Sequence, residues 1–331
     1  MKFAVLPLLA AWAVTQAGQT APPPTRDRRG GVAVLRSDGI LRPFASFDND
    51  KWQAIWPFGP APEFPLTLSD VPESWWGRAS PAGWQAHTLD GEVRPLPLGN
   101  PTLYWVLCSP RVGLKTSHGD PETGPPVPPQ PFAKDGVAIT GGVPLEPIET
   151  IAPDSPDASA LIAQLFGELN AAEDKTVRGV RRDTGWRHPL ERPAREARPF
   201  KLEAWYRSPS GKPGWTVSYI EAVRAYDPGP NDQGCGLETL VSGWIHHRDG
   251  VLSKRADLRG KITYCDRVGA TAMLPFGRMT PRERSYWLFQ LSGWENEWYG
   301  VAEVGPDKVR HVVEVPVGRC PTGMPRRDLL R

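Results

Sequence analysis

The stretch WTVSYIEAVRAY at residues 215–226 indicates the fold class of this chain. Trp215, Val217 and Tyr219 alternate with polar residues, which is the pattern of a strand that buries one face and exposes the other. The stretch LETLVSGWIH at residues 237–246 is a second strand candidate. These two stretches predict a β-sheet in the C-terminal part of the chain.

Strands are predicted throughout the chain after Phe200. The connections at 208–214, 248–250 and 305–308 are short, and short connections join antiparallel neighbours. We therefore expect an antiparallel meander or a partly closed barrel. Its predicted strands are residues 201–207, 215–226, 237–246, 261–265, 286–291, 298–304 and 309–317.

One amphipathic helix is predicted near residues 156–173. Ser155 before Pro156 is a typical helix start, because the Ser hydroxyl caps free backbone N–H groups and Pro fits the first turn. The following apolar residues recur at helical spacing and would cover the sheet. The basic segment 175–198 is expected to be a loop. The predicted fold class is therefore mainly β with a minor α component (α+β).

A smaller β-rich unit is predicted to precede this domain. Asp38-Gly39 and Asp90-Gly91 each separate two strand-like runs, which indicates β-hairpins. Residues 102–108, TLYWVLC, are expected to form a buried strand. The chain of 331 residues then divides into a signal peptide at 1–17, a disordered lead-in at 18–30, an N-terminal β-rich unit at 31–117, a Pro-rich connector at 118–134 and a C-terminal antiparallel β domain at 135–331.

The first residues predict export from the cytoplasm. Lys2 precedes the apolar run at residues 3–14, and small residues follow up to Ala17, as in a secretory signal peptide. The run is shorter than the roughly 20 residues that cross a bilayer, so no membrane span is expected. A formal net charge of +2 does not indicate a nucleic-acid partner. We expect a periplasmic or secreted protein.

The four cysteines, Cys108, Cys235, Cys265 and Cys320, form no C-x-x-C motif. An even number of cysteines in an exported protein favours disulfides. Strand direction in the meander places Cys235 and Cys265 at one end of the sheet and Cys320 nearer the other end. We therefore expect the pairs Cys235–Cys265 and Cys108–Cys320.

Motifs of the common catalytic classes are absent from the sequence. It contains no G-x-S-x-G, no H-E-x-x-H, no phosphate-binding Walker loop and no dinucleotide fingerprint. No cofactor is expected. The leading hypothesis is a non-catalytic binding or structural protein of the cell envelope or extracellular space.

The alternative hypothesis is a secreted hydrolase that acts on an extracellular polymer through a carboxylate pair drawn from Glu221, Asp266 and Glu297. Glu221 falls on the apolar parity of its strand, and a buried carboxylate must be paired or titrate abnormally. Arg224 and Arg267 are its candidate partners. A buried salt bridge, or a strand that twists outward, explains such a residue without catalysis and is the preferred interpretation.

Metal binding through His246 or His311 is a third hypothesis. His246 and His247 are adjacent, and adjacent strand residues point to opposite faces, so they cannot chelate one ion together. An exposed strand end explains the pair without a metal, and no metal is expected.

Two sets of residues are candidates for ligand binding. Trp75 and Trp76 are expected at the surface, where they would stack on sugar rings, and burial in a core is the alternative. Arg181 and Arg182 lie in a basic segment that would hold a polyanion such as an acidic polysaccharide or a lipid headgroup, and a solvated loop is the alternative. The expected partner is therefore a glycan or another envelope polymer.

Overall fold

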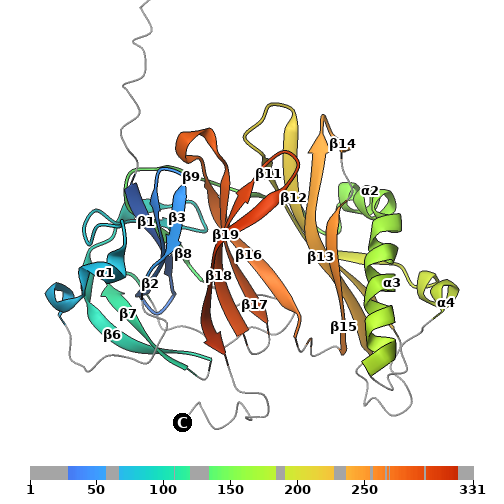
Figure 1. The fold of residues 1–331 in the computed structure, drawn as a ribbon, viewed down its shortest axis with the longest axis horizontal. Helices are drawn as coiled ribbons and strands as arrows, with labels where there is room; N and C mark the ends of the chain where they lie inside the picture. Colours follow the sequence, from blue (N-terminus) through green and yellow to red (C-terminus); the bar gives the residue numbers. More distant parts are fainter. Residues whose placement is uncertain are drawn as a thin grey trace, which may run out of the picture.

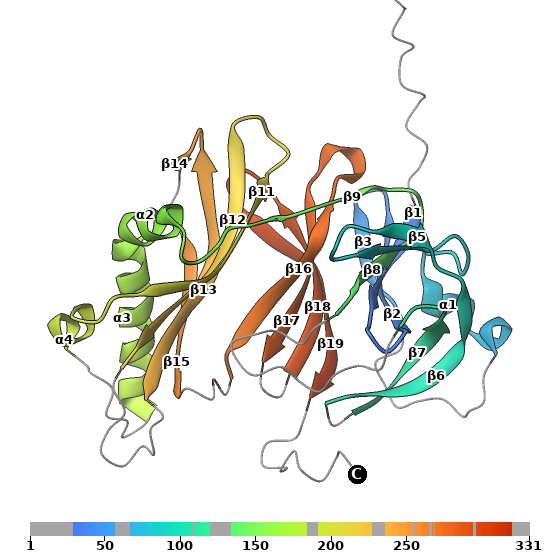
Figure 2. The ribbon, with the colours of Figure 1, turned by 180° about the vertical axis from the view of Figure 1, so that it is seen from behind.

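The computed structural model describes residues 29–56, 67–107, 109–119, 134–183, 191–226, 236–253, 256–264, 267, 269–293 and 296–319. These residues form three antiparallel sheets and a small number of helices, which confirms the predicted mainly β (α+β) class. Figures 1 and 2 show the three sheets side by side, with the helices between residues 156 and 196 outside the third. We name the sheets A, B and C in this order.

Sheet A has the strand order β5-β4-β8-β1-β2-β7-β6, and β3 pairs with β2. The two predicted hairpins join β1 to β2 and β4 to β5. Gly39 and Gly91 turn them with φ of 78° and 92°, which glycine adopts without strain. The elements are β1 (Arg29–Leu35), β2 (Ile40–Asp48), β3 (Lys51–Ala54), η1 (Leu68–Asp70), α1 (Glu73–Trp76), β4 (Gln85–Thr88), β5 (Val93–Pro95), β6 (Leu98–Val106), β7 (Ser109–Thr116) and β8 (Gly136–Ile139).

The predicted C-terminal meander is present, and its strands lie in two sheets. Sheet C has the order β10-β11-β12-β13-β14, with β15 also on β13, and sheet B has the order β19-β18-β17-β16-β9. The strands are β9 (Leu145–Glu146), β10 (Glu149–Thr150), β11 (Lys201–Pro209), β12 (Trp215–Ala225), β13 (Leu237–Arg248), β14 (Val251–Leu252), β15 (Asp257–Tyr264), β16 (Thr271–Met279), β17 (Tyr286–Gly293), β18 (Asn296–Val304) and β19 (Val309–Arg319).

Strand β17 explains why sheet B lies in the middle. Residues Tyr286, Trp287, Leu288 and Phe289 are each at most 1% exposed. Tyr286 and Leu288 belong to the core shared with sheet A, whereas Trp287 and Phe289 belong to the core shared with sheet C. A strand with apolar side chains on both faces needs a partner layer on each.

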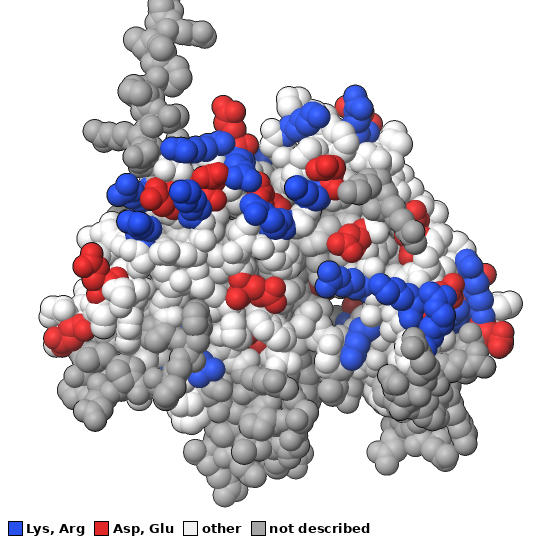
Figure 3. All heavy atoms as spheres, in the orientation of Figure 1, with Lys and Arg blue, Asp and Glu red and all other residues white. Residues whose placement is uncertain are grey.

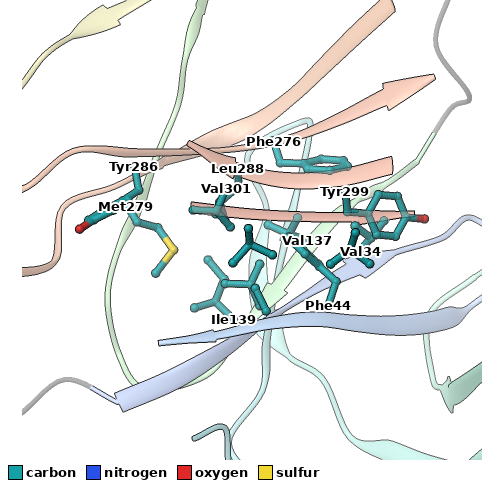
Figure 4. Packing of buried hydrophobic residues seen from close by; sticks show 14 of the residues in the cluster. Val34, Phe44, Val137, Ile139, Phe276, Met279, Tyr286, Leu288, Tyr299 and Val301 are labelled. Atoms are coloured by element: carbon teal, nitrogen blue, oxygen red, sulfur yellow. The ribbon is translucent and has the colours of Figure 1, made fainter. Parts of the chain in front are cut away.

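The core between sheets A and B joins residues far apart in sequence. Figure 4 shows Val34 and Phe44 of sheet A facing Val301 and Tyr299 of sheet B. Strand β8, which follows the predicted connector at 118–134, pairs with β1 and β4 in sheet A. The division at 31–117 and 135–331 stays a prediction, and the packing adds that the two parts share a core.

Three helices lie on the outer side of sheet C. They are α2 (Pro156–Gln164), α3 (Phe166–Asp183) and α4 (Arg192–Glu196). The Ser155 hydroxyl accepts a hydrogen bond from the Ala158 N–H at 3.2 Å, as its position predicts. Within the described residues, no helix combines the length and apolar composition that a bilayer crossing requires.

The prediction of a loop over 175–198 is wrong at both ends, because α3 continues to Asp183 and α4 follows at Arg192. Val177 is 6% exposed and packs with Tyr226 and Ile262. The apolar face of the helix therefore extends beyond residue 173, although the surrounding residues are basic.

A buried ion network also holds α3 and α4 against β12. Arg224 donates to Glu173 and, at 3.0 Å, to Oδ1 of Asn170. Arg195 of α4 lies 3.3 Å from the same Glu173 carboxylate. Arg224 was one expected partner of Glu221; that pairing is wrong, because its guanidinium faces the helices.

All four cysteines lie outside the described residues, and their described neighbours come together in two places. Leu237 pairs with Tyr264 across β13 and β15. Gly318 lies so close to Val106 that a Cβ on the glycine would collide with the Val106 backbone. Arg111 beside this contact donates to the Val317 carbonyl at 2.6 Å.

These neighbours are consistent with the predicted disulfides Cys235–Cys265 and Cys108–Cys320. Peptide mapping without reduction should recover both linked pairs, each stabilising the fold by about 2–4 kcal/mol. Recovery of a Cys235–Cys320 peptide would contradict this pairing.

Candidate functional site

A cleft of about 610 Å³ lies where edges of the three sheets meet. This volume is in the usual range for a binding site, about 300–1,000 Å³. The β4–β5 hairpin of sheet A forms one side, β9 and β16 of sheet B form another, and Tyr206 of β11 contributes from sheet C. Its lining includes His87, Glu92, Val93, Glu146, Tyr206 and Phe276.

The cleft follows from the way the chain passes between the sheets. Leu145 pairs with Met279 at the edge of sheet B, and Glu149 pairs with Arg207 at the edge of sheet C. The segment between them crosses from one sheet to the other (Figure 2). On the opposite side the Asp90-Gly91 turn leaves Val93 57% exposed. The exposed apolar side chain of Val93 therefore lies across the cleft from the segment that joins β9 to β10.

The charged groups of the cleft are largely compensated. Arg278 pairs with Glu146, and Arg94 lies 3.9 Å from Glu92. Burial lowers the pKa of His87, so its imidazole is neutral at neutral pH. The cleft therefore offers apolar surface together with hydrogen-bonding groups, and little net charge.

Tyr206 connects the cleft to a buried polar contact between sheets B and C. Its hydroxyl donates to the Met273 carbonyl at 3.2 Å, and Glu221 Oε1 accepts from the Met273 N–H at 2.7 Å. Met273 lies on β16, whose other neighbour β9 pairs only with Arg278 and Met279. No described strand pairs with Met273 on this side of β16. The Tyr206 hydroxyl and the Glu221 carboxyl of sheet C therefore satisfy its backbone C=O and N–H groups instead.

Glu221 lies inward, as its sequence parity indicates, and is 8% exposed. The pKa of Glu221 is raised to about 8: burial is the largest cause and the charge of Glu203 adds to it, whereas the Met273 N–H and Arg267 partly offset the rise. Arg267 itself donates to Glu203 and to Glu238, the latter at 3.0 Å. Glu221 is therefore mostly protonated at neutral pH.

The proposed carboxylate pair is not assembled from the described candidates. Glu297 lies in the interface of sheets A and B, where it accepts from Lys134 Nζ at 3.3 Å and from the Tyr299 hydroxyl at 2.8 Å. Glu221 lies in the interface of sheets B and C. Neither residue lines the cleft, and Asp266 lies outside the described residues.

The two histidine candidates are on different sheets. His246 is 4% exposed on β13. His311 on β19 packs its ring against Phe289 at 5.4 Å and lies 3.4 Å from the Glu314 carboxylate. Across the described part of the chain, no three His, Cys, Asp or Glu residues are arranged to hold a metal ion.

Trp75 and Trp76 pack in a cluster of tryptophans under sheet A. Trp76 is 4% exposed and lies edge-on to Trp56 at 5.1 Å, so the expectation of surface exposure is wrong for this residue. Trp75 is half-buried and meets the same Trp56 at 5.2 Å. Their large rings anchor the short helix α1 to the core.

Arg181 and Arg182 continue α3, and their side chains lie outside the described residues. Among the described tryptophans, the exposed one is instead Trp105, at 62%. Residues 102–108 were expected to form a buried strand, but β6 is an edge strand with Leu103 and Trp105 on its open face.

The cleft residues were not singled out from the sequence. His87 is an isolated histidine, and Tyr206 and Phe276 occupy ordinary strand positions. The Asp90-Gly91 turn was the one available signal, and it predicts a hairpin without saying what the hairpin faces.

Comparison with known proteins found no match among protein-family models, curated proteins or solved structures. The functional proposal below therefore rests on the residues of this chain alone.

The raised pKa of Glu221 predicts a pH-dependent stability. A free glutamate titrates near 4.5 and folded Glu221 at about 8, so between these values the folded chain holds the extra proton. The free energy of unfolding then falls as pH rises, by up to about 1.4 kcal/mol per pH unit. Glu221→Gln keeps an acceptor for Met273 and does not titrate, so urea denaturation across this window should show a flatter slope.

The control for this measurement is Glu314→Gln, which changes an exposed carboxylate. It should keep the wild-type slope. If Glu221→Gln also keeps that slope, Glu221 is ionised in the folded protein and the assignment is wrong.

Proposed function

We propose that this protein is an exported, non-catalytic binding protein that holds a neutral glycan segment of an envelope or extracellular polymer in the cleft between the three sheets. The observation that carries the proposal is the composition of the cleft, which combines apolar surface with uncharged hydrogen-bonding groups. Most ligand sites have this character.

The apolar part of the cleft suits one face of a sugar ring. Val93 is 57% exposed at its mouth and Leu89 is 49% exposed beside it. Ile148 and Phe276 line the opposite side. Covering exposed apolar surface of this kind with the C–H face of a sugar stabilises the complex by roughly 25 cal/mol per Å².

The polar part suits the hydroxyl groups of the same ring. Neutral His87 has a donor and an acceptor nitrogen, and Thr88 and Thr150 add hydroxyl groups to the lining. Because Arg278 and Arg94 compensate the two carboxylates, a strongly charged ligand would find no unpaired partner there. This favours a neutral glycan.

Export is the second part of the proposal. It is supported by the signal-peptide pattern of residues 1–17 and by the even number of cysteines. Two disulfides would suit an oxidising compartment, either the periplasm or the outside of the cell.

A hydrolase that uses Glu221 and Glu297 has less support. The two carboxyl groups occupy different sheet interfaces and are held by internal hydrogen bonds. Glycoside hydrolysis needs both carboxyl groups on one substrate, within about 10 Å of each other.

Filling the cleft should abolish glycan binding. Val93→Trp places a large side chain at the mouth, and we expect at least about a tenfold loss of affinity for the neutral polysaccharide that an array identifies, measured by calorimetry. The matched control is Val251→Trp, which changes a valine 65% exposed on β14, away from the cleft, and should bind like the wild type.

Two outcomes would contradict the proposal. If Val93→Trp binds the polysaccharide as tightly as the wild type, the cleft is not the site. If the polysaccharide is shortened on incubation with the wild type, the protein is not a pure binding protein.

A further inference from the structure

A second hollow lies between α3 and β15, on the far side of sheet C from sheet B. Its volume is about 570 Å³, and it shares no residue with the cleft between the three sheets. We call it the α3–β15 groove. Among the described strands β15 pairs with β13 alone, so no described strand covers its other edge along the groove.

Among the described residues that line the groove, every charged one is cationic. They are Lys175 of α3 and Arg259 and Lys261 of β15, and no described carboxylate lines it. Figure 3 shows Lys and Arg side chains gathered across this part of the surface, where α3 and β15 lie in Figure 1. The groove therefore carries a local positive potential in a chain whose formal net charge is only +2.

These three cationic side chains form no ion pair or hydrogen bond with the described residues. Two other exposed arginines do form ion pairs: Arg192 pairs with Glu196 at 2.7 Å and Arg310 pairs with Glu303 at 2.6 Å. No described carboxylate therefore competes with an external anion for these three cations.

The floor of the groove is apolar and formed in part by glycine. Leu258 and Ile262 contribute side chains from β15. Gly260 allows α3 to approach closely, because a Cβ there would collide with Thr176. Gly179 faces open space, with no atom within 4 Å of the position a Cβ would take.

We propose that the α3–β15 groove binds an acidic polysaccharide. Sugar rings would lie on the apolar floor beside Lys175 of α3. Their carboxylates would pair with Lys175 and, around the open edge of β15, with Arg259 and Lys261, which point to the other face of that strand. Arg259 and Lys261 are two residues apart on one strand, about 6.6 Å along its axis, so they present charge in a row. A polyphosphate chain has no apolar face to cover the floor, which is why we favour an acidic sugar polymer.

This proposal does not depend on what the cleft binds. The two sites lie on different elements, and separate variants address them. Loss of binding in Gly179→Leu with normal behaviour of Val93→Trp would assign the acidic polymer to the groove alone.

The test uses the full chain and polygalacturonate, a polymer of uronic acid. Wild-type protein should bind it in calorimetry, and binding should vanish near 1 M salt, where the screening length is about 3 Å. Gly179→Leu fills the groove while improving helix propensity, so we expect at least about a tenfold loss of affinity. Gly167→Leu is the matched control, since Gly167 is also in α3 with open space around it and lies outside the groove.

A second pair of variants tests the charges. Lys175→Gln with Lys261→Gln should weaken binding by at least about tenfold. Lys51→Gln with Lys308→Gln removes the same charge from exposed lysines elsewhere and should leave the affinity nearly unchanged. Circular dichroism of every variant checks that the fold is retained.

Three results would overturn the proposal. One is equal binding by Gly179→Leu and the wild type. Another is equal loss of affinity in both double lysine variants, which would indicate attraction to net charge. The last is tighter binding to inorganic polyphosphate, or to vesicles of anionic lipid, than to polygalacturonate.

Discussion

The double burial of β17 is the constraint on which the rest of the structure depends. Tyr286 and Leu288 need sheet A, and Trp287 and Phe289 need sheet C. Each large side chain of this kind contributes roughly 1.5–3 kcal/mol when it is fully buried. Sheets A and C are therefore stabilised by the same central strand, although residues of sheet A come mainly from the first third of the chain.

Stacking three sheets also encloses polar groups, and each interface satisfies them with hydrogen bonds between its layers. Between sheets B and C, Glu221 and Tyr206 bind the backbone of Met273. Between sheets A and B, Glu297 receives hydrogen bonds from Lys134 and Tyr299. Buried polar groups need such partners, which explains inward carboxylates without catalysis. The space left for a ligand lies at the sheet edges and beside α3.

Local signals in the sequence predicted the antiparallel strands after Phe200, the Asp-Gly hairpins and the start of the helix at Ser155. Each depends on a few neighbouring residues whose conformational preferences are strong. The continuous apolar run at residues 286–289 also held a signal for burial on both faces, but a run of this length does not say which sheets cover it. The helix beyond residue 173 was missed because Val177 and Val180 stand among basic residues.

The candidate sites were harder to predict than the fold. Parity correctly indicated that Glu221 lies inward, yet its polar partner is the backbone of a strand 52 residues away. The cleft needs edges of three sheets to meet, and the α3–β15 groove needs a glycine on a strand to lie beneath a helix. Both depend on tertiary packing, which no local pattern reports.

Hydrogen exchange of backbone amides in the native protein tests the central role of β17 most directly. Our account predicts that amides of β17 and β18 exchange only by global unfolding, and that core amides of sheets A and C lose protection together with them as denaturant is added. Exchange of the core of sheet A or sheet C at low denaturant, while β17 stays fully protected, would show that the layers unfold independently and would contradict the account.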